Sequence, residues 1–223
     1  MNDPRRDVPV PKRLAERPRD ERNYLVPFFV GYVDGKPDFR LIAPGRVAEC
    51  YRGDLCWLCG GKLGRHRWFV VGPMCVANRL SSEPPSHYEC ALYAVQVCPH
   101  LVRPQAKRRE ANLPENRSAP PGIAIAANPG TIVMWESHTY TPKKADGGVL
   151  FNLGEPASAP EWWTEGRRAS RLEATTAFER SCENLWRMAR YDAEREGSEA
   201  PLRYLERQIA SARQFLPQGE AAE

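Results

Sequence analysis

The sequence predicts an α+β protein with short strands over most of its length and two long helices near the C-terminus. The chain holds 21 prolines among 223 residues, which favours irregular connections and short elements. Apolar residues alternate with polar ones in several runs bounded by turn sequences, a pattern typical of strands. Only after residue 170 do apolar residues recur at helical spacing over long stretches. The length is enough to bury a core in one domain or two small ones.

From the pattern of residues 1–53 we expect an arm, a β-hairpin and a short helix. Residues 1–22 carry four prolines among mixed charges, which favours a flexible or polyproline-like arm. Apolar side chains then alternate from Val26 to Tyr32, Asp34-Gly35 supplies a turn, and residues 39–42 form the returning strand. A short helix is expected over 45–52, with Gly53 at its end.

Two closely spaced pairs of metal-ligating residues follow. Cys56 and Cys59 precede two glycines, which predicts a tight knuckle that turns back towards a metal ion. His87 and Cys90 lie three residues apart at the start of a helix expected over 87–97, so both side chains project from one face of its first turn. Ser86 is the expected N-cap of this helix, which Pro99 should end.

The segment between the two pairs predicts a strand over 68–71, ended by Gly72-Pro73, and a loop over 78–85. Knuckle, strand and helix in this order are the parts of a treble-clef zinc finger. The sequence therefore predicts one Zn²⁺ held by Cys56, Cys59, His87 and Cys90. The alternative is a turn of unligated thiols in a reducing compartment.

Other cysteines complicate the ligand assignment. Cys75 follows the expected strand and could replace His87 or Cys90 at the metal. Cys98 and His100 at the helix end could join Cys75 at a second metal, although a buried thiol and a helix-ending Pro-His are the more ordinary explanation. The remaining two cysteines, Cys50 and Cys182, fall in helical patterns and are expected to be core thiols.

The second half of the chain predicts a small antiparallel sheet and two helices. Strands are expected over 123–126, 131–135 and 149–153, separated by the turn 128–130 and a polar stretch over 143–148. Ser170 and Glu173 form a capping box for the first long helix, and Pro217 closes the second. The predicted organisation is an arm (1–22), the hairpin with the zinc module (23–102), a basic linker (103–121), the sheet with two helices (122–217) and a tail (218–223).

Charge favours an anionic partner for the predicted zinc module. Residues 44–110 hold ten Lys or Arg against five Asp or Glu, although the formal net charge of the chain is only +4. Trp162-Trp163 and Arg167-Arg168 are weaker candidates for stacking and phosphate contact. The candidate nucleic-acid contacts are Lys62, Arg65, Arg67, Arg79, Lys107, Arg108 and Arg109. No apolar run suits a signal peptide or a membrane span, so we expect a cytoplasmic protein.

The predicted module resembles the scaffold of HNH-type nucleases. The catalytic His of those enzymes stands at the end of the strand, where this chain carries Gly72-Pro73, so the resemblance implies a scaffold without the general base. His66 precedes the strand and Glu83 is the only carboxylate in the loop; a nuclease would have to use them in unusual places.

A wider resemblance links residues 20–135 to a group of bacterial and phage proteins that has no assigned activity. It rests on a set of short motifs that include Cys56-Trp57-x-Cys59-Gly60, Gly72-Pro73-Met74-Cys75, Glu83-Pro84-Pro85-x-His87 and Cys98-Pro99. The resemblance implies a phage or prophage setting and places Cys75 and Cys98 in the same pattern as the four ligands.

We therefore expect a non-enzymatic zinc-binding protein whose basic lobe binds nucleic acid or a protein partner. Two alternatives remain open: a degenerate HNH-type metal-dependent nuclease, and a phage protein that blocks a host complex and uses zinc only to stabilise its shape.

Overall fold

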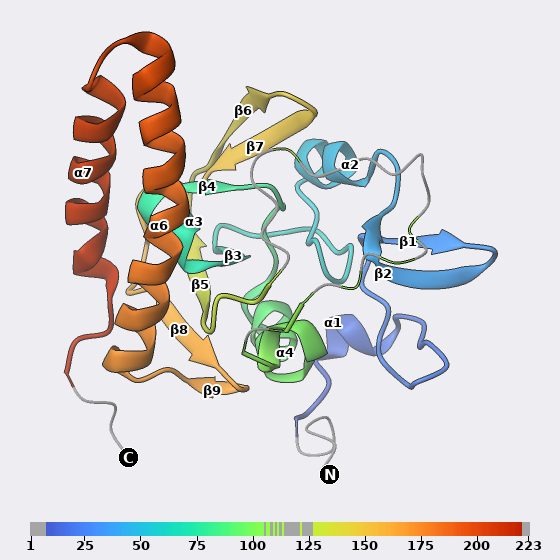
Figure 1. The fold of residues 1–223 in the computed structure, drawn as a ribbon. Coiled ribbons are helices and arrows are strands. Elements are labelled where there is room, and N and C mark those ends of the chain that lie inside the picture. The colour runs from blue at the N-terminus through green and yellow to red at the C-terminus, as the bar shows by residue number, and fades with distance from the viewer. Residues whose placement is uncertain are drawn as a thin grey trace.

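The computed structural model of the chain describes residues 8–104, 106, 107, 109, 111, 113, 121 and 127–219 (Figure 1). It is an α+β fold with small antiparallel sheets and two C-terminal helices. Most of the predicted linker and the strand predicted over 123–126 lie outside the described residues, as does the beginning of the predicted arm.

The N-terminal region folds around the predicted hairpin. Its strands are β1 (Val30–Val33) and β2 (Lys36–Ile42), and both turn residues, Asp34 and Gly35, have positive φ. Two positive φ angles give the turn a twist that matches the strands. The first strand begins at Val30 and not at Val26. Helix α2 (Arg46–Gly53) follows as predicted, but its left-handed C-cap is Asp54 and not Gly53.

Part of the predicted arm is folded against the rest of the molecule. Residues 12–15 form α1 (Lys12–Ala15), which buries Leu14 in a cluster with Leu25 and Trp57. This contact could not be predicted from the sequence, because a single apolar side chain among prolines and charges carries no periodic pattern.

A four-stranded antiparallel sheet occupies the centre of the molecule. Its order is β3 (Arg67–Val71), β5 (Ile132–Ser137), β8 (Glu161–Thr164) and β9 (Arg167–Arg168). Phe69 of β3 pairs with Trp135 of β5. Strands from both sides of the predicted linker therefore belong to one sheet.

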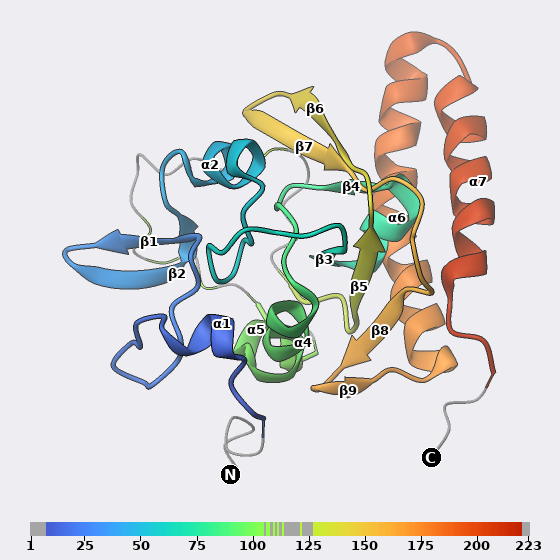
Figure 2. The same ribbon diagram turned by 180° about the vertical axis from the view of Figure 1, so that it is seen from behind.

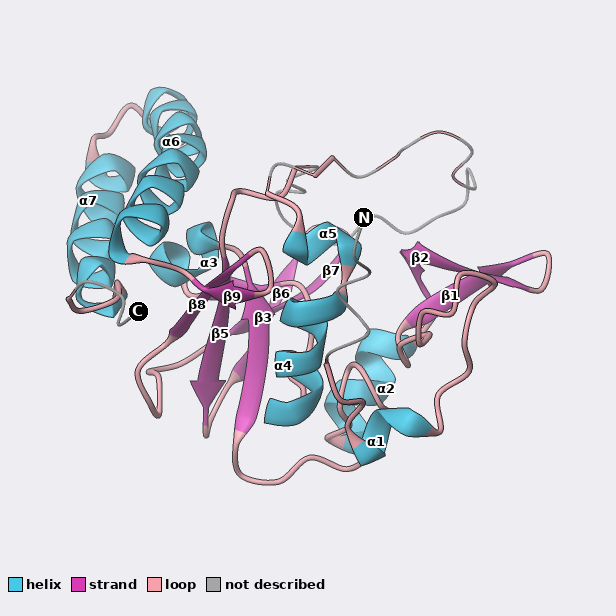
Figure 3. Cartoon of the chain, turned by 90° about the horizontal axis from the view of Figure 1, so that it is seen from below, coloured by secondary structure: helices cyan, strands magenta, loops and turns pink. Residues whose placement is uncertain are grey.

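Helices cover both faces of this sheet (Figure 3). Side chains of a strand alternate between its faces, so Val133 and Trp135 of β5 pack into the cluster built with α6 and α7, while Ile132 and Met134 pack with Val95 of α4. Burial on both faces explains why every residue of β5 is buried.

A second, three-stranded antiparallel sheet has the order β4 (Leu80–Ser81), β7 (Gly148–Asn152) and β6 (Thr141–Ala145). The sequence predicted only β7. Strand β6 falls partly in the stretch assigned to a polar loop, because its edge position leaves Lys143 and Lys144 exposed and removes the apolar alternation. Strand β4 lies in the stretch 78–85, which was also predicted as a loop.

Prolines begin two helices that the sequence analysis missed. Pro73 opens α3 (Pro73–Asn78) directly after β3, and Pro99 opens α5 (Pro99–Val102) after α4 (Tyr88–Val97). Both prolines stand in the first turn, where the missing N–H costs no helical hydrogen bond. By sequence pattern alone, both prolines signal only the end of the preceding element.

The two predicted C-terminal helices are α6 (Arg171–Glu196) and α7 (Ala200–Ala212), followed by a short 3₁₀ turn, η1 (Arg213–Phe215). They lie side by side along one flank of the molecule (Figures 1 and 2). The predicted capping box is present, since the Ser170 side chain accepts from the Glu173 amide and the Glu173 side chain accepts from the Ser170 amide.

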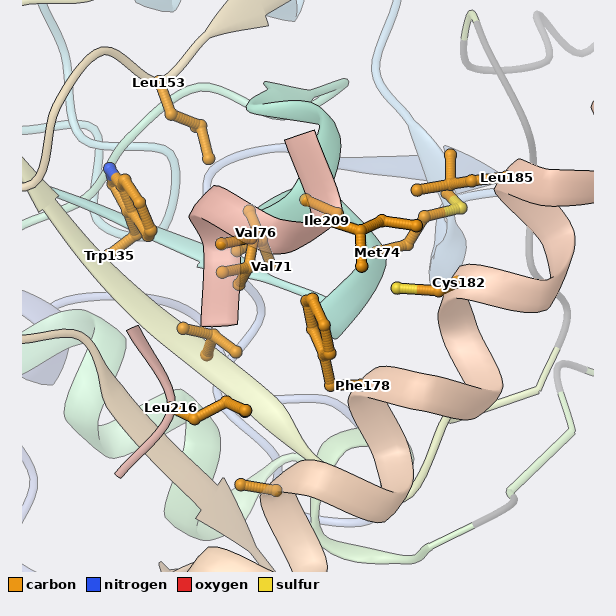
Figure 4. Packing of buried hydrophobic residues seen from close by; sticks show 14 of the residues in the cluster. Val71, Met74, Val76, Trp135, Leu153, Phe178, Cys182, Leu185, Ile209 and Leu216 are labelled. Carbon is orange, nitrogen blue, oxygen red and sulfur yellow. The ribbon is translucent and has the colours of Figure 1, made fainter. Parts of the chain in front are cut away.

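The main core lies between this helical pair and the sheet (Figure 4). Phe178 and Cys182 of α6 and Ile209 of α7 meet Val76 of α3 and Trp135 of β5. The predicted core thiol Cys182 is buried here. Short α3 is thus held between the long helices and the sheet, which fixes the segment that leads on towards α4.

Candidate metal centre

The Cys56–Cys59 segment forms a tight turn between α2 and β3. The Cys56 amide donates to the Gly61 carbonyl (2.8 Å), and the Gly60 amide donates to the Cys56 carbonyl (2.9 Å). Gly60 has a φ of +81°, and a Cβ at this position would lie 2.8 Å from the Phe28 ring. Only glycine satisfies both conditions, so Gly60 allows the chain to turn and present both thiols on one side.

The second pair stands where α4 begins. His87 is the N-cap residue and Cys90 is buried in the first turn. The expected N-cap, Ser86, is not the cap; its amide and carbonyl instead pair with those of Trp68 in β3 (2.7 and 2.9 Å). The Trp57 amide also donates to the Pro85 carbonyl (3.0 Å). The backbone therefore ties the start of α4 to both the knuckle and the strand.

The four side chains meet at one point. The Sγ atoms of Cys56, Cys59 and Cys90 and a ring nitrogen of His87 all lie within 4.8 Å of one another, so this group could hold a metal ion. His87 Nδ1 is 3.4 Å from Cys59 Sγ and 4.0 Å from Cys90 Sγ. Sulfur at about 2.3 Å and nitrogen at about 2.0 Å from a tetrahedral ion would lie roughly 3.5 Å apart, so the observed distances fit such a site closely.

Surrounding hydrogen bonds orient the donors. His87 Nε2 lies 3.0 Å from the Lys62 carbonyl oxygen. Because a carbonyl oxygen can only accept a hydrogen bond, Nε2 carries the proton, and Nδ1 is the nitrogen that can bind a metal. The amides of Cys59 and Gly61 donate to the sulfurs of Cys56 (3.4 Å) and Cys59 (3.3 Å). Such bonds stabilise thiolates over thiols.

Protonation within the group is strongly coupled. Hydrogen bonds to Cys56 and Cys59 raise the pKa of His87 to about 10. Burial opposes ionisation of Cys56, but hydrogen bonds with Cys59, Cys90 and His87 hold its pKa below the ordinary value of a thiol. Hydrogen bonds to Cys56 and Cys59 raise the pKa of Cys90. Negative charge is thus favoured on Cys56, whereas Cys90 and His87 hold protons that a divalent cation would displace.

The donor group is enclosed by apolar side chains. Cys56 and Cys90 are fully buried, and they pack with Trp57, Leu58 and Leu63. Cys50, predicted as a core thiol, belongs to the same cluster, and burial raises its pKa to about 12. The enclosure keeps water from the sulfurs of Cys56 and Cys90, whereas Cys59 is partly exposed, and it suits a stabilising site better than a reactive one.

The other predicted ligands lie elsewhere. Cys75 in α3 packs against the main core, and burial raises its pKa to about 12. Burial also raises the pKa of Cys98. Within the described part of the chain, neither these two thiols nor His100 belongs to a group spaced for metal binding. The structure therefore gives Cys75 no place in the four-residue group and does not assemble a site from Cys75, Cys98 and His100.

The predicted nucleic-acid contacts differ in how available they are. Lys62 and Arg65 are exposed beside the knuckle, where the Lys62 ammonium donates to the Gly53 carbonyl (2.8 Å), and Lys107 and Arg109 are also exposed. Arg67 is held in a two-point ion pair with Asp54 and donates to the His138 carbonyl. Arg79 lies over the rings of Trp135 and Phe215, both at 4.6 Å, and donates to the Gly154 carbonyl. Arg67 and Arg79 are thus engaged internally, whereas Arg108 lies outside the described residues.

Two further candidates have structural roles or other neighbours. Trp162 and Trp163 are buried in the sheet, so neither ring is offered for stacking on a base. His66 is not grouped with Glu83; it contacts Glu136 at the end of β5, close to His138. Glu136 and His138 were not among the residues predicted from the sequence. The available signal was their spacing of two residues at the end of a strand, which favours placing both side chains on one face.

Comparison of the chain with models of protein families, with curated proteins and with solved structures finds no match. Within the residues that the structure describes, no helix combines the length and the apolar character that crossing a membrane requires.

Proposed function

We propose that Cys56, Cys59, His87 and Cys90 bind one Zn²⁺ that stabilises the fold. The observation that carries the proposal is the mutual spacing of the four donor atoms, which are all within 4.8 Å. Three sulfurs and one imidazole suit zinc, and four protein ligands fill its tetrahedron, so no position remains for a substrate. Burial of Cys56 and Cys90 among apolar residues supports a structural role.

We further propose that the knuckle, β3 and the start of α4 form a treble clef. The supporting observations are the backbone bonds that tie Ser86 to Trp68 and Trp57 to Pro85. They bring the second ligand pair back to the first across a strand, which is the relation that a treble clef requires. Zinc would then join the knuckle to the start of α4, whose buried cysteines belong to a cluster other than the main core.

The function that we propose for this module is binding of nucleic acid through exposed cations beside the knuckle. Lys62 and Arg65 lie on the same short segment, and the Lys62 carbonyl accepts the His87 hydrogen bond. A metal that orders His87 would therefore also order the backbone that carries both cations. Arg67 and Arg79 are withdrawn from the proposed contacts because Asp54 and the aromatic rings already engage them.

A titration tests this function: zinc-loaded protein is added to labelled duplex and single-stranded DNA and RNA. Fluorescence anisotropy at about 50 and 200 mM salt should show affinity that falls as salt rises, because each phosphate contact releases counterions. Lys62→Glu combined with Arg65→Glu should abolish binding. The matched control, Arg187→Glu with Arg190→Glu, makes the same charge change on exposed positions of α6. Absence of binding at the lower salt would reject the nucleic-acid function in favour of a protein partner.

A further inference from the structure

A second cluster of metal-ligating side chains lies at one edge of the central sheet. His66 immediately precedes β3, Glu136 is in β5, and His138 follows β5. The pairing of Arg67 with Ser137 and of Trp68 with Glu136 brings these strand ends together. Because side chains alternate along a strand, all three residues fall on the same face of the sheet, the face that α4 covers.

The three side chains converge on one carboxylate oxygen. His66 Nδ1 is in hydrogen-bond contact with Glu136 Oε1, and His138 Nε2 lies 3.7 Å from the same oxygen. The two imidazole rings meet edge to face, with their centroids 5.0 Å apart. One donor atom from each residue lies within 4.8 Å of the other two.

The carboxylate of this cluster is buried, whereas one of its two imidazoles is exposed to solvent. The side chain of Glu136 is 8% exposed, whereas that of His66 is 66% exposed. Burial works against ionisation of Glu136, but hydrogen bonds with Ser158 and His66 lower its pKa overall. The carboxylate is therefore charged, and the hydrogen bond from Ser158 holds it in place.

One atom of the cluster lacks a partner. His138 Nε2 is buried and has no hydrogen bond, since 3.7 Å to Glu136 Oε1 is too long for one. A buried polar nitrogen without a hydrogen-bond partner destabilises the fold. Because His138 Nε2 lies near the Glu136 carboxylate, a cation placed between them would satisfy the nitrogen. A cation between the two groups would bind both.

We propose that His66, Glu136 and His138 form a second metal site, which takes a divalent transition-metal ion of the zinc class through two imidazoles and one carboxylate. Nitrogen and oxygen ligands at about 2.0 to 2.2 Å from such an ion would lie roughly 3.4 Å apart, close to the separation between His138 and Glu136. His66 must move slightly away from Glu136, and its exposure permits this movement. The ion would replace the hydrogen bond between His66 and Glu136.

This second site differs in its open coordination from the group of Cys56, Cys59, His87 and Cys90, called the Cys₃His group below. Three protein ligands leave at least one coordination position for water or for an oxygen of a bound molecule, whereas four ligands leave none. The exposed His66 marks the side from which such a molecule would approach. The site carries no sulfur, so its metal complex has no thiolate absorption.

Calorimetry and cobalt spectroscopy on the full chain test the proposal. Protein that already holds one equivalent of Zn²⁺ should bind a second equivalent of Zn²⁺ or Co²⁺, and the second Co²⁺ should show ligand-field bands without sulfur-to-metal charge transfer. His66→Gln and His138→Gln should each weaken the second binding step at least tenfold and leave the first equivalent in place. His100→Gln, which changes a histidine outside both groups, should leave both steps unchanged.

Imidazole NMR provides a readout that does not depend on affinity. The second equivalent of Zn²⁺ should shift the ring resonances of His66 and His138 and not those of His100. A single binding step that His66→Gln and His138→Gln leave unchanged overturns the proposal, and so does a second step that persists in both variants. Failure of the Cys₃His proposal looks different, because the tightly held first equivalent would then be missing while the second site could still bind.

Discussion

The imidazole of His87 donates from Nε2 to the carbonyl oxygen of Lys62, 3.0 Å away. This bond joins the N-cap of α4 to the segment that leaves the cysteine knuckle, so it orients the imidazole before any metal is considered. Nδ1 is directed towards the sulfurs of Cys59 and Cys90 as a result. The candidate metal group is thus pre-arranged by backbone contacts, which reduces the cost of ordering its ligands.

Replacing one ligand should release the metal. Cys90→Ser should lose bound zinc and lower the thermal midpoint of unfolding, because hydroxyl oxygen is a poor substitute for a buried thiolate and metal affinity contributes directly to stability. Zinc content by elemental analysis and calorimetric unfolding check this. Cys75→Ser is the control, since Cys75 lies outside the group; loss of zinc in this variant would restore Cys75 as a ligand.

Gly60 should tolerate no side chain. Gly60→Ala places a Cβ 2.8 Å from the Phe28 ring at a φ of +81°. Left-handed strain alone costs roughly 1–2 kcal/mol, and the clash adds to it, so chemical denaturation should show at least that loss. Gly64→Ala is the matched control, because a Cβ there meets nothing within 4 Å. Equal stability of both variants would contradict the described knuckle.

The main core should depend on Phe178. This side chain is fully buried between α6 and the sheet, so Phe178→Ala should reduce the free energy of unfolding by about 3–5 kcal/mol. Leu172→Ala on the same helix removes a side chain that is 76% exposed and should change it little. Urea unfolding distinguishes them, and a similar small loss in both would place α6 away from the sheet.

The capping box should give α6 a measurable pH dependence. The hydrogen bond from Arg167 is the main reason why the pKa of Glu173 falls to about 2. A carboxyl whose pKa is lower in the folded state stabilises the protein above its unfolded pKa of about 4.3 and loses that contribution as pH falls towards 2. Glu173→Gln should therefore lower stability at pH 7 and flatten its decline between these pH values.

Unfolding of wild type and variant across this pH range measures the difference. Ser170→Ala is the companion change and should cost about 1 kcal/mol at pH 7, because it removes the side-chain cap of α6. A Glu173→Gln profile parallel to the wild type would show that the interaction with Arg167 contributes nothing.

Local patterns in the sequence predicted the features that depend on neighbouring residues. The spacing of Cys56 with Cys59 and of His87 with Cys90 identified the four-residue group, Asp34-Gly35 located the hairpin turn, and Ser170 with Glu173 marked the start of α6. Each signal operates within a few residues, where the geometry of a turn or a helix relates sequence to position.

Features that depend on distant contacts escaped prediction. The segment with the exposed lysines of β6 forms a strand only because β7 pairs with it. Glu136 contacts His66 only because β5 lies beside β3. The internal roles of Arg67 and Arg79 also depend on partners elsewhere in the chain, Asp54 and Trp135. Spacing alone does not reveal which cation is free and which is engaged.

X-ray absorption at the zinc edge, on protein that holds one equivalent of zinc, tests whether the four residues bind the metal. We expect three sulfur ligands at about 2.3 Å and one nitrogen at about 2.0 Å from the metal. A first shell of nitrogen and oxygen only, or protein that retains no zinc, would contradict the assignment of Cys56, Cys59, His87 and Cys90 as the metal centre.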